Sequence, residues 1–157
     1  MLKLLVIDLK SKRHVILLFL LYISILIFVT FVGVTTSFPE RFYANYAEVS
    51  HNFIPFNTIR NYLINFQYYN LNNWIYNTFG NILLFMPMGI ILPILFTRIK
   101  GFFLIKVILF FSLAIETTQY VTRLGVFDVD DIILNTLGGY LGYFIFVLFQ
   151  NTKHLFN

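Results

Sequence analysis

The sequence predicts an all-α integral membrane protein, a bundle of four transmembrane helices with both chain termini in the cytoplasm. Three observations lead to this class. Hydrophobic residues make up 59% of the 157 residues and charged residues only 11%, whereas soluble domains carry roughly 25% charged residues. Four apolar runs each approach or reach the length of about 20 helical residues that crosses a bilayer. Lys and Arg residues gather at alternate ends of these runs, as the positive-inside rule requires.

The composition also excludes several classes of protein. The net charge of +4 does not indicate a nucleic-acid partner, because the basic residues lie in short flanks of the apolar runs. The chain contains no cysteine, which excludes disulfides, thiolate catalysis and cysteine-ligated metals. No cofactor is indicated. We therefore expect a single membrane domain, residues 1–157, located in the plasma membrane with the lipid bilayer as its partner.

The first predicted span covers residues 15–34, which carry no charge. At about 1.5 Å per residue, a helix of this length matches one hydrocarbon thickness. A cleaved signal peptide is the alternative, but its apolar region would be about 7–15 residues long and would end in a small-residue cleavage site. This run is longer and no such site follows it, so we expect an uncleaved transmembrane helix.

The first outer loop, residues 35–78, is rich in Tyr, Asn and Phe and is interrupted by Pro39 and Pro55. Aromatic residues favour the membrane–water interface. We therefore expect an interfacial loop that covers part of the bundle, with a short surface helix over residues 60–74.

The remaining spans are predicted at residues 79–96, 102–121 and 132–149. Of the 11 Lys and Arg residues, only Arg41, Arg60 and Arg123 fall in the two loops assigned to the outside. The positive-inside rule then places both termini and the loop between spans two and three in the cytoplasm.

This topology brings polar residues of three spans to the outer leaflet. The third span delivers a set spaced i, i+3, i+7 on one helix face, and the fourth delivers a pair spaced i, i+4. The predicted polar cluster consists of Asn81, Glu116, Gln119, Arg123, Asp131 and Asn135. Gly138 and Gly142 form a small-xxx-small pair, which predicts close packing of the fourth span on a neighbour.

Glu116 is the leading candidate for a catalytic residue, because an ionisable residue inside a span is costly and is a functional-site hypothesis by default. It could serve as a general acid or base. The alternative is a structural carboxylate, paired with Arg123 or hydrogen-bonded by Gln119 and Asn81, since polar residues in spans also join helices.

Asp128, Asp130 and Asp131 follow the third span in a short turn. Asp128 and Asp131 are candidate catalytic residues or ligands of a divalent cation, which binds carboxylate oxygens. Helix capping is the alternative, and we expect it of Asp130 or Asp131, with Asp128 the freer side chain. Arg123 could bind an anionic group of a ligand or neutralise these acids. Asn81 and Asn135 are expected to hydrogen-bond other buried polar groups.

At these residues the chain resembles the VanZ-like family of membrane proteins. The matching pieces are residues 52–56 (NFIPF), residues 81–89 (NILLFMPMG), Glu116-x-x-Gln119, Arg123, Asp128-x-Asp130-Asp131, Asn135, and Gly138-Gly139 with Gly142. The resemblance spans about residues 15–150 and implies a multi-pass plasma-membrane protein. The family's name member is associated with low-level resistance to the glycopeptide teicoplanin. The resemblance supplies no reaction.

Two classes of function follow. One is a non-enzymatic envelope protein that changes how glycopeptides reach or engage cell-surface targets. The other is a membrane-embedded enzyme acting on a lipid-linked or cell-wall substrate, with Glu116 as acid or base. A solute transporter is less favoured, because four spans without paired broken helices do not fit that architecture.

Overall fold

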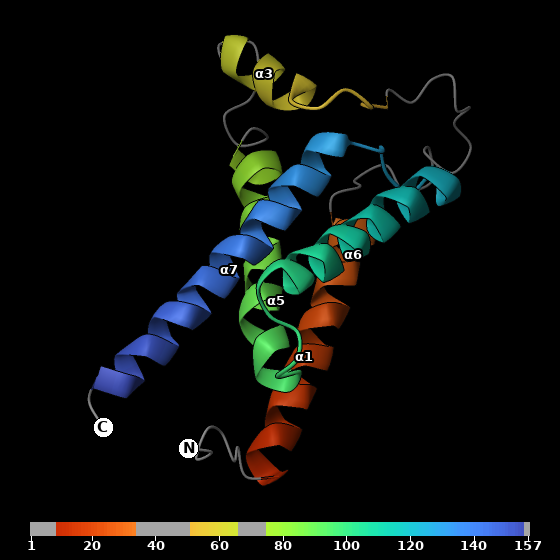
Figure 1. The fold of residues 1–157 in the computed structure, drawn as a ribbon. Helices are drawn as coiled ribbons and strands as arrows, with labels where there is room; N and C mark the ends of the chain where they lie inside the picture. The colour runs from red at the N-terminus through yellow and green to blue at the C-terminus, as the bar shows by residue number, and fades with distance from the viewer. Residues whose placement is uncertain (1–8, 34–50, 66–74, 156–157) are drawn as a thin grey trace.

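The computed structural model describes residues 9–33, 51–65 and 75–155, and almost all of them are helical (Figure 1). The elements follow the order α1, η1, α3, η4, α5, α6, α7. Four of the helical segments are long and apolar enough to cross a membrane. The predicted all-α membrane bundle is therefore confirmed.

The four spans lie close to the predicted ranges. The first is α1 (Leu9–Phe28), which continues as the π-helical turn η1 (Val29–Gly33). The second begins with the π-helical turn η4 (Tyr76–Gly80) and continues as α5 (Asn81–Leu95).

The third and fourth spans are α6 (Gly101–Thr122) and α7 (Val129–Leu155). The last helix starts three residues before the predicted span and runs past its predicted end at residue 149. In Figure 1, α1 begins and α7 ends at the same end of the bundle, as an even number of crossings requires. The connection between α5 and α6 also lies towards that end.

The short helix of the first outer loop differs from its prediction. The structure has α3 at Asn57–Ile64, so the helix begins three residues earlier than expected. Residues 66–74 of the predicted helix lie outside the described residues. Figure 1 shows α3 lying across the end of the bundle, above the beginnings of α5 and α7. It occupies the position expected of a loop that covers the polar ends of the spans.

Glycines of α7 set the spacing of the central helix pair. α5 and α7 form the most extensive helix–helix contact of the structure. A Cβ atom on Gly138 would overlap the backbone carbonyl of Ile82, and one on Gly142 would overlap that of Met86. Both overlaps involve backbone atoms of α5, which cannot move aside as a side chain can. The predicted close packing of the glycine face is therefore confirmed, and α5 is the neighbour.

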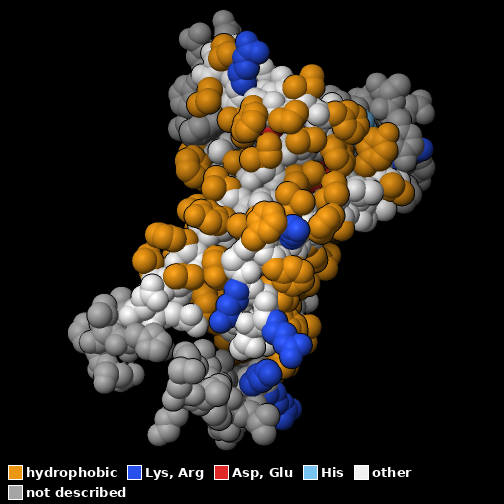
Figure 2. Space-filling model, viewed as in Figure 1, with side chains coloured by type: hydrophobic (Ala, Val, Ile, Leu, Met, Phe, Trp, Pro, Cys, Tyr) orange, Lys and Arg blue, Asp and Glu red, His pale blue; other side chains and the backbone are white. Residues whose placement is uncertain are grey.

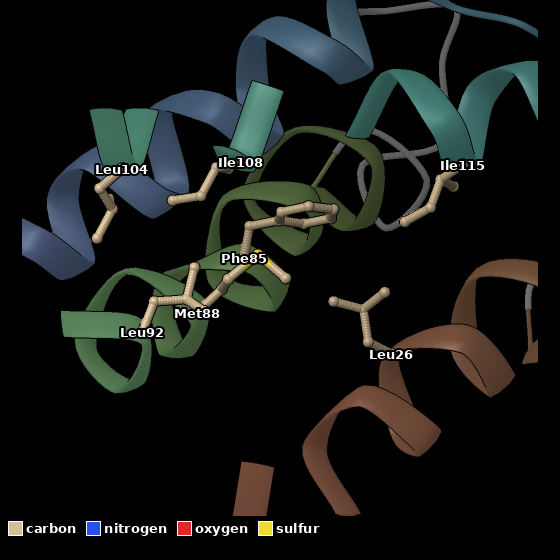
Figure 3. Packing of buried hydrophobic residues seen from close by; sticks show 7 residues of the cluster. All are labelled: Leu26, Phe85, Met88, Leu92, Leu104, Ile108 and Ile115. Carbon is tan, nitrogen blue, oxygen red and sulfur yellow. The ribbon is translucent and has the colours of Figure 1, made fainter. Parts of the chain in front are cut away.

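A small apolar core joins the first three spans (Figure 3). Leu26 of α1, Phe85 of α5 and Ile108 of α6 are at most 1% exposed. The complete cluster is Leu26, Phe85, Met88, Leu92, Leu104, Ile108 and Ile115. Many other large apolar side chains remain on the outside of the helices, as the orange surface in Figure 2 shows. Such a surface suits contact with lipid rather than water.

The glycine packing gives a first prediction. Gly142→Ala should lower the melting temperature of the detergent-purified protein, because the added methyl group meets the Met86 carbonyl. Overpacking costs about 1–3 kcal/mol, and each kcal/mol shifts the melting temperature of a chain of this size by roughly 2–4 °C. We expect a fall on the order of 5 °C, measured by intrinsic fluorescence during heating.

Gly80→Ala is the matched control, because a Cβ atom there has no neighbour within 4 Å. Its melting temperature should stay near that of the wild type. Equal melting temperatures for the two variants would show that the α5–α7 contact has room for an added methyl group.

Candidate functional site

The acidic residues of the described chain gather at one end of the bundle. Four of the seven acidic residues of the sequence lie in the described ranges, and all four belong to the end of α6, the following turn or the start of α7. They are Glu116, Asp128, Asp130 and Asp131. Glu116 is 3% exposed and Asp130 is fully buried. The carboxyl groups of the other three interact electrostatically with that of Asp131.

The basic residues gather mainly at the opposite end. Lys12 and Arg13 lie at the start of α1, and Arg98 and Lys100 lie between α5 and α6. In Figure 2 most of the blue side chains lie in the lower half of the molecule, where α1 begins. The ammonium group of Lys106 lies 4.7 Å from the ring centroid of Phe102. The bundle therefore has a basic end and an acidic end.

At the acidic end, the first outer loop pairs with the turn between α6 and α7. Asn52 forms an isolated parallel β-bridge with Asp128. The Asn52 N–H donates to the Phe127 carbonyl at 2.9 Å, and the Val129 N–H donates to the Asn52 carbonyl at 3.0 Å. Two segments far apart in the sequence are thereby joined through their backbones.

The side chain of Asp128 supports this junction. Its Oδ1 atom accepts hydrogen bonds from Asn52 Nδ2 at 2.8 Å and from the Asp130 N–H at 2.8 Å. Its Oδ2 atom accepts from the Thr58 hydroxyl at 2.6 Å. The bond to the Asp130 N–H, two residues on, is that of an N-cap residue. Asp128 therefore caps α7 and also holds the outer loop.

Asp130 caps a different helix, α3 of the outer loop. Its Oδ1 atom accepts from the Phe56 N–H and its Oδ2 atom accepts from the Ile59 N–H at 3.0 Å. Phe56 is the residue just before α3 and Ile59 is its third residue, and the N–H groups at a helix start have no partner within the helix. Phe56 has φ 64°, a left-handed conformation that is costly for a non-glycine residue.

The expectation that Asp130 or Asp131 caps α7 and that Asp128 is freer was therefore wrong. Asp128 accepts the N-cap hydrogen bond, and Asp130 reaches across to another segment. The earlier start of α3 has the same origin, because the buried carboxylate of Asp130 supplies the acceptors that the first turn needs.

Glu116 also supports the junction. Its Oε2 atom accepts a hydrogen bond from the Asp128 N–H at 3.0 Å. The carboxylate lies on α6, one turn from Ser112 and facing the start of α7. Arg123, expected on the same helix face, ends α6 with φ 61° and is half-buried.

The amide residues of the predicted cluster divide between two places. Asn81 of α5 donates to Asp131 Oδ1 at 2.6 Å, and Asn135 of α7 donates to the buried Ser112 hydroxyl at 2.9 Å. These bonds join α7 to both neighbouring spans. Gln119 instead donates to the Thr30 carbonyl of η1 at 3.1 Å. The structure thus places Gln119 towards the first span, outside the group around Asp131.

Some residues of the site were not predicted from the sequence to belong to it. His51 accepts a hydrogen bond from the Phe127 N–H at Nδ1, 3.3 Å away, and its ring lies 4.7 Å from that of Tyr120. Thr58 and Ser112 also take part, as described above. Asn52 did carry a signal, since it belongs to a piece that resembles the family, but the residue type alone did not indicate its partner.

Buried polar atoms without a hydrogen-bond partner mark the interior of the site. Within the described residues these are His51 Nε2, Asn135 Oδ1 and Thr136 Oγ1. The same part of the chain contains no group of three His, Asp or Glu side chains arranged to hold a metal ion.

Comparison with known proteins gives a family match over most of the chain. A family model described as VanZ/LLP1 matches residues 17–150. The chain is also similar to Protein VanZ of Enterococcus faecium, with 29% identity over 111 residues, which cover 71% of this chain. The chain spans 60% of the length of that relative. No solved structure matches.

The role of Asp130 gives a second prediction. Asp130→Ala leaves the Phe56 and Ile59 N–H groups without their acceptor, so α3 should detach from the bundle more often. Hydrogen bonds to a charged group contribute about 1.5–3 kcal/mol each. Trypsin should therefore cut after Arg60 at least about tenfold faster, measured by mass spectrometry of the fragments from the protein in detergent.

Asp131→Asn is the matched control. The new side chain retains an acceptor oxygen for Asn81. The hydrogen bonds at the start of α3 go to Asp128 and Asp130 instead, so cleavage after Arg60 should stay at the wild-type rate. Unchanged cleavage in Asp130→Ala would mean that other contacts hold α3.

Proposed function

Because this chain belongs to the VanZ/LLP1 family, we propose that it changes the susceptibility of the cell to glycopeptide antibiotics of the teicoplanin type, or related envelope properties. It is a multi-pass protein of the plasma membrane. In this proposal the polar cluster acts without catalysing a reaction, by building an outward-facing surface. A glycopeptide or a lipid-linked cell-wall precursor is the partner that this surface would meet.

The charge distribution supports an outward position of the acidic end. Positive residues are retained on the cytoplasmic side of membrane proteins, and here they lie mainly at the end where α1 begins (Figure 2). Both termini would then be cytoplasmic. The junction between the outer loop and the turn after α6 would face the compartment in which glycopeptides act.

One observation carries the non-catalytic interpretation. The carboxylates of Glu116, Asp128 and Asp130 accept hydrogen bonds from N–H and hydroxyl groups of the loop and the turn. Hydrogen bonds from fixed backbone and hydroxyl donors hold each of these carboxylates in one position. These acids therefore serve to shape the surface rather than to transfer protons.

An enzyme is the second candidate, and one observation favours it. Glu116 is 3% exposed within a membrane-spanning helix and interacts electrostatically with Asp131. A buried carboxylate beside another is an arrangement used in acid–base catalysis. In that case Glu116 is the acid or base, Arg123 binds an anionic group of a lipid-linked substrate, and Asp128 and Asp131 assist.

A third prediction distinguishes the two candidate functions by the effect of changing Glu116. Under the non-catalytic proposal, Glu116→Gln keeps an acceptor oxygen for the Asp128 N–H and retains most of the resistance, whereas Glu116→Ala removes the acceptor and lowers both resistance and protein stability. The measurement is the minimal inhibitory concentration of teicoplanin in a susceptible Gram-positive host. Membrane levels of each variant are quantified in parallel, together with melting temperatures.

Loss of resistance in Glu116→Gln, at a wild-type membrane level and melting temperature, would favour the enzyme and refute the non-catalytic proposal. The wild-type chain must first raise the inhibitory concentration above that of the empty host. No rise at all would refute an effect on teicoplanin susceptibility.

The orientation gives a fourth prediction. Because the chain contains no cysteine, a single introduced cysteine can be labelled without background. In intact protoplasts a membrane-impermeant maleimide should label Asn61→Cys, whose native side chain is exposed. It should label Thr97→Cys, at the exposed connection after α5, only after permeabilisation. The opposite pattern would invert the topology and remove the basis for an outward-facing site.

A further inference from the structure

We propose that one side of α3 lies in the headgroup region of the leaflet at the acidic end of the bundle, and that Arg60 binds the phosphate of an anionic phospholipid there. The three parts of the argument are the depth of α3, the residues on its exposed side, and the surroundings of Arg60. None of them depends on the antibiotic-related function.

The depth of α3 follows from its attachment to α7. The Phe56 and Ile59 N–H groups donate to Asp130, which lies in the first turn of the span Val129–Asn151. The Thr58 hydroxyl donates to Asp128, just before that span. The first turn of α3 is therefore within hydrogen-bond distance of the point where α7 enters the membrane. Phospholipid headgroups occupy this same level.

One side of α3 exposes apolar residues around a single arginine. Phe56, Leu63 and Ile64 are 60%, 64% and 62% exposed. Within the helix, Arg60, Leu63 and Ile64 are spaced i, i+3 and i+4, so they share one side of a helix that turns about 100° per residue. Phe56 immediately precedes the helix. Ile59 is half-buried, on a different part of the helix circumference.

Lipid is the occupant that fits this side. The two residues before the turn of α3, Phe53 and Ile54, are also apolar and are 61% and 68% exposed. A contiguous apolar surface of this kind is unfavourable in water. At the boundary of a span it continues the lipid-facing surface of the helices below, and helices with such a side lie in the interface of a bilayer.

Arg60 supplies the preference for an anionic headgroup. Its side chain is exposed, lies between Leu63 and Ile64 around the helix, and has no ion pair among the described residues. An arginine in such a setting covers apolar neighbours with its aliphatic stem and extends its charged group to the headgroups. Its planar guanidinium matches a phosphate with two parallel hydrogen bonds.

Quenching by brominated lipid tests both the location and the preference. The full chain carries Leu63→Trp in a Trp74→Phe background, since Trp74 is its one native tryptophan. The protein is reconstituted in bilayers of phosphatidylcholine and phosphatidylglycerol, with bromine on the acyl chains of one lipid at a time. We expect strong quenching of the introduced tryptophan.

Asn61→Trp in the same background is the matched control. Residue 61 is exposed but lies about 200° from residue 63 around the helix, so its tryptophan should be quenched much less. Equal or weaker quenching at residue 63 would place the apolar side of α3 away from lipid and overturn the proposal.

The preference for an anionic headgroup is read from the ratio of quenching by the two brominated lipids. One basic side chain near a membrane surface contributes about 1 kcal/mol, which corresponds to roughly a fivefold enrichment of the anionic lipid. Arg60→Gln should abolish this enrichment, and Arg60→Lys, which keeps the charge but not the two parallel hydrogen bonds, should retain only part of it. An enrichment that survives Arg60→Gln, or that is absent from the wild-type Arg60 background, would overturn the assignment of Arg60.

Discussion

The acidic end of this bundle depends on one constraint: backbone N–H groups near the hydrocarbon boundary must find acceptors within the protein. The first outer loop brings such donors at Phe56 and Ile59, and Asp130 supplies both acceptors. Asp128 and Glu116 do the same for the turn that begins α7. An isolated buried carboxylate would be very costly. Here each buried carboxylate accepts hydrogen bonds, which offset part of the cost of its burial. The same hydrogen bonds fix the positions of the loop and the turn.

The spans could be predicted from the sequence because the bilayer fixes their length and apolar composition. The glycine face of α7 could also be predicted, since Gly138 and Gly142 repeat at the spacing of close helix contacts. The bounds of α3 could not. Its start depends on Asp130, more than seventy residues away in the sequence. A local pattern of aromatic residues contains no information about an acceptor supplied by another segment.

Part of the polar site was predictable for a similar reason, and part was not. The convergence of Asn81 with Asp131 follows from topology, because the second and fourth spans run in the same direction and therefore begin at the same level. The fact that Glu116 and Gln119 contact different helices does not follow from topology. A separation of three residues places them about 60° apart around a helix, which is enough for one to face α7 and the other to reach Thr30 of η1. Which aspartate capped which helix likewise depended on the packing of the loop.

The parallel bridge between Asn52 and Asp128 also has a consequence for biosynthesis. A membrane protein is inserted as it is translated, and the loop leaves the ribosome well before the turn with which it pairs. Until that turn has been synthesised, the loop has none of the acceptors that Asp128 and Asp130 provide. The outward surface is therefore completed only with the last span, so a chain truncated before residue 128 would carry the loop sequence without its folded form.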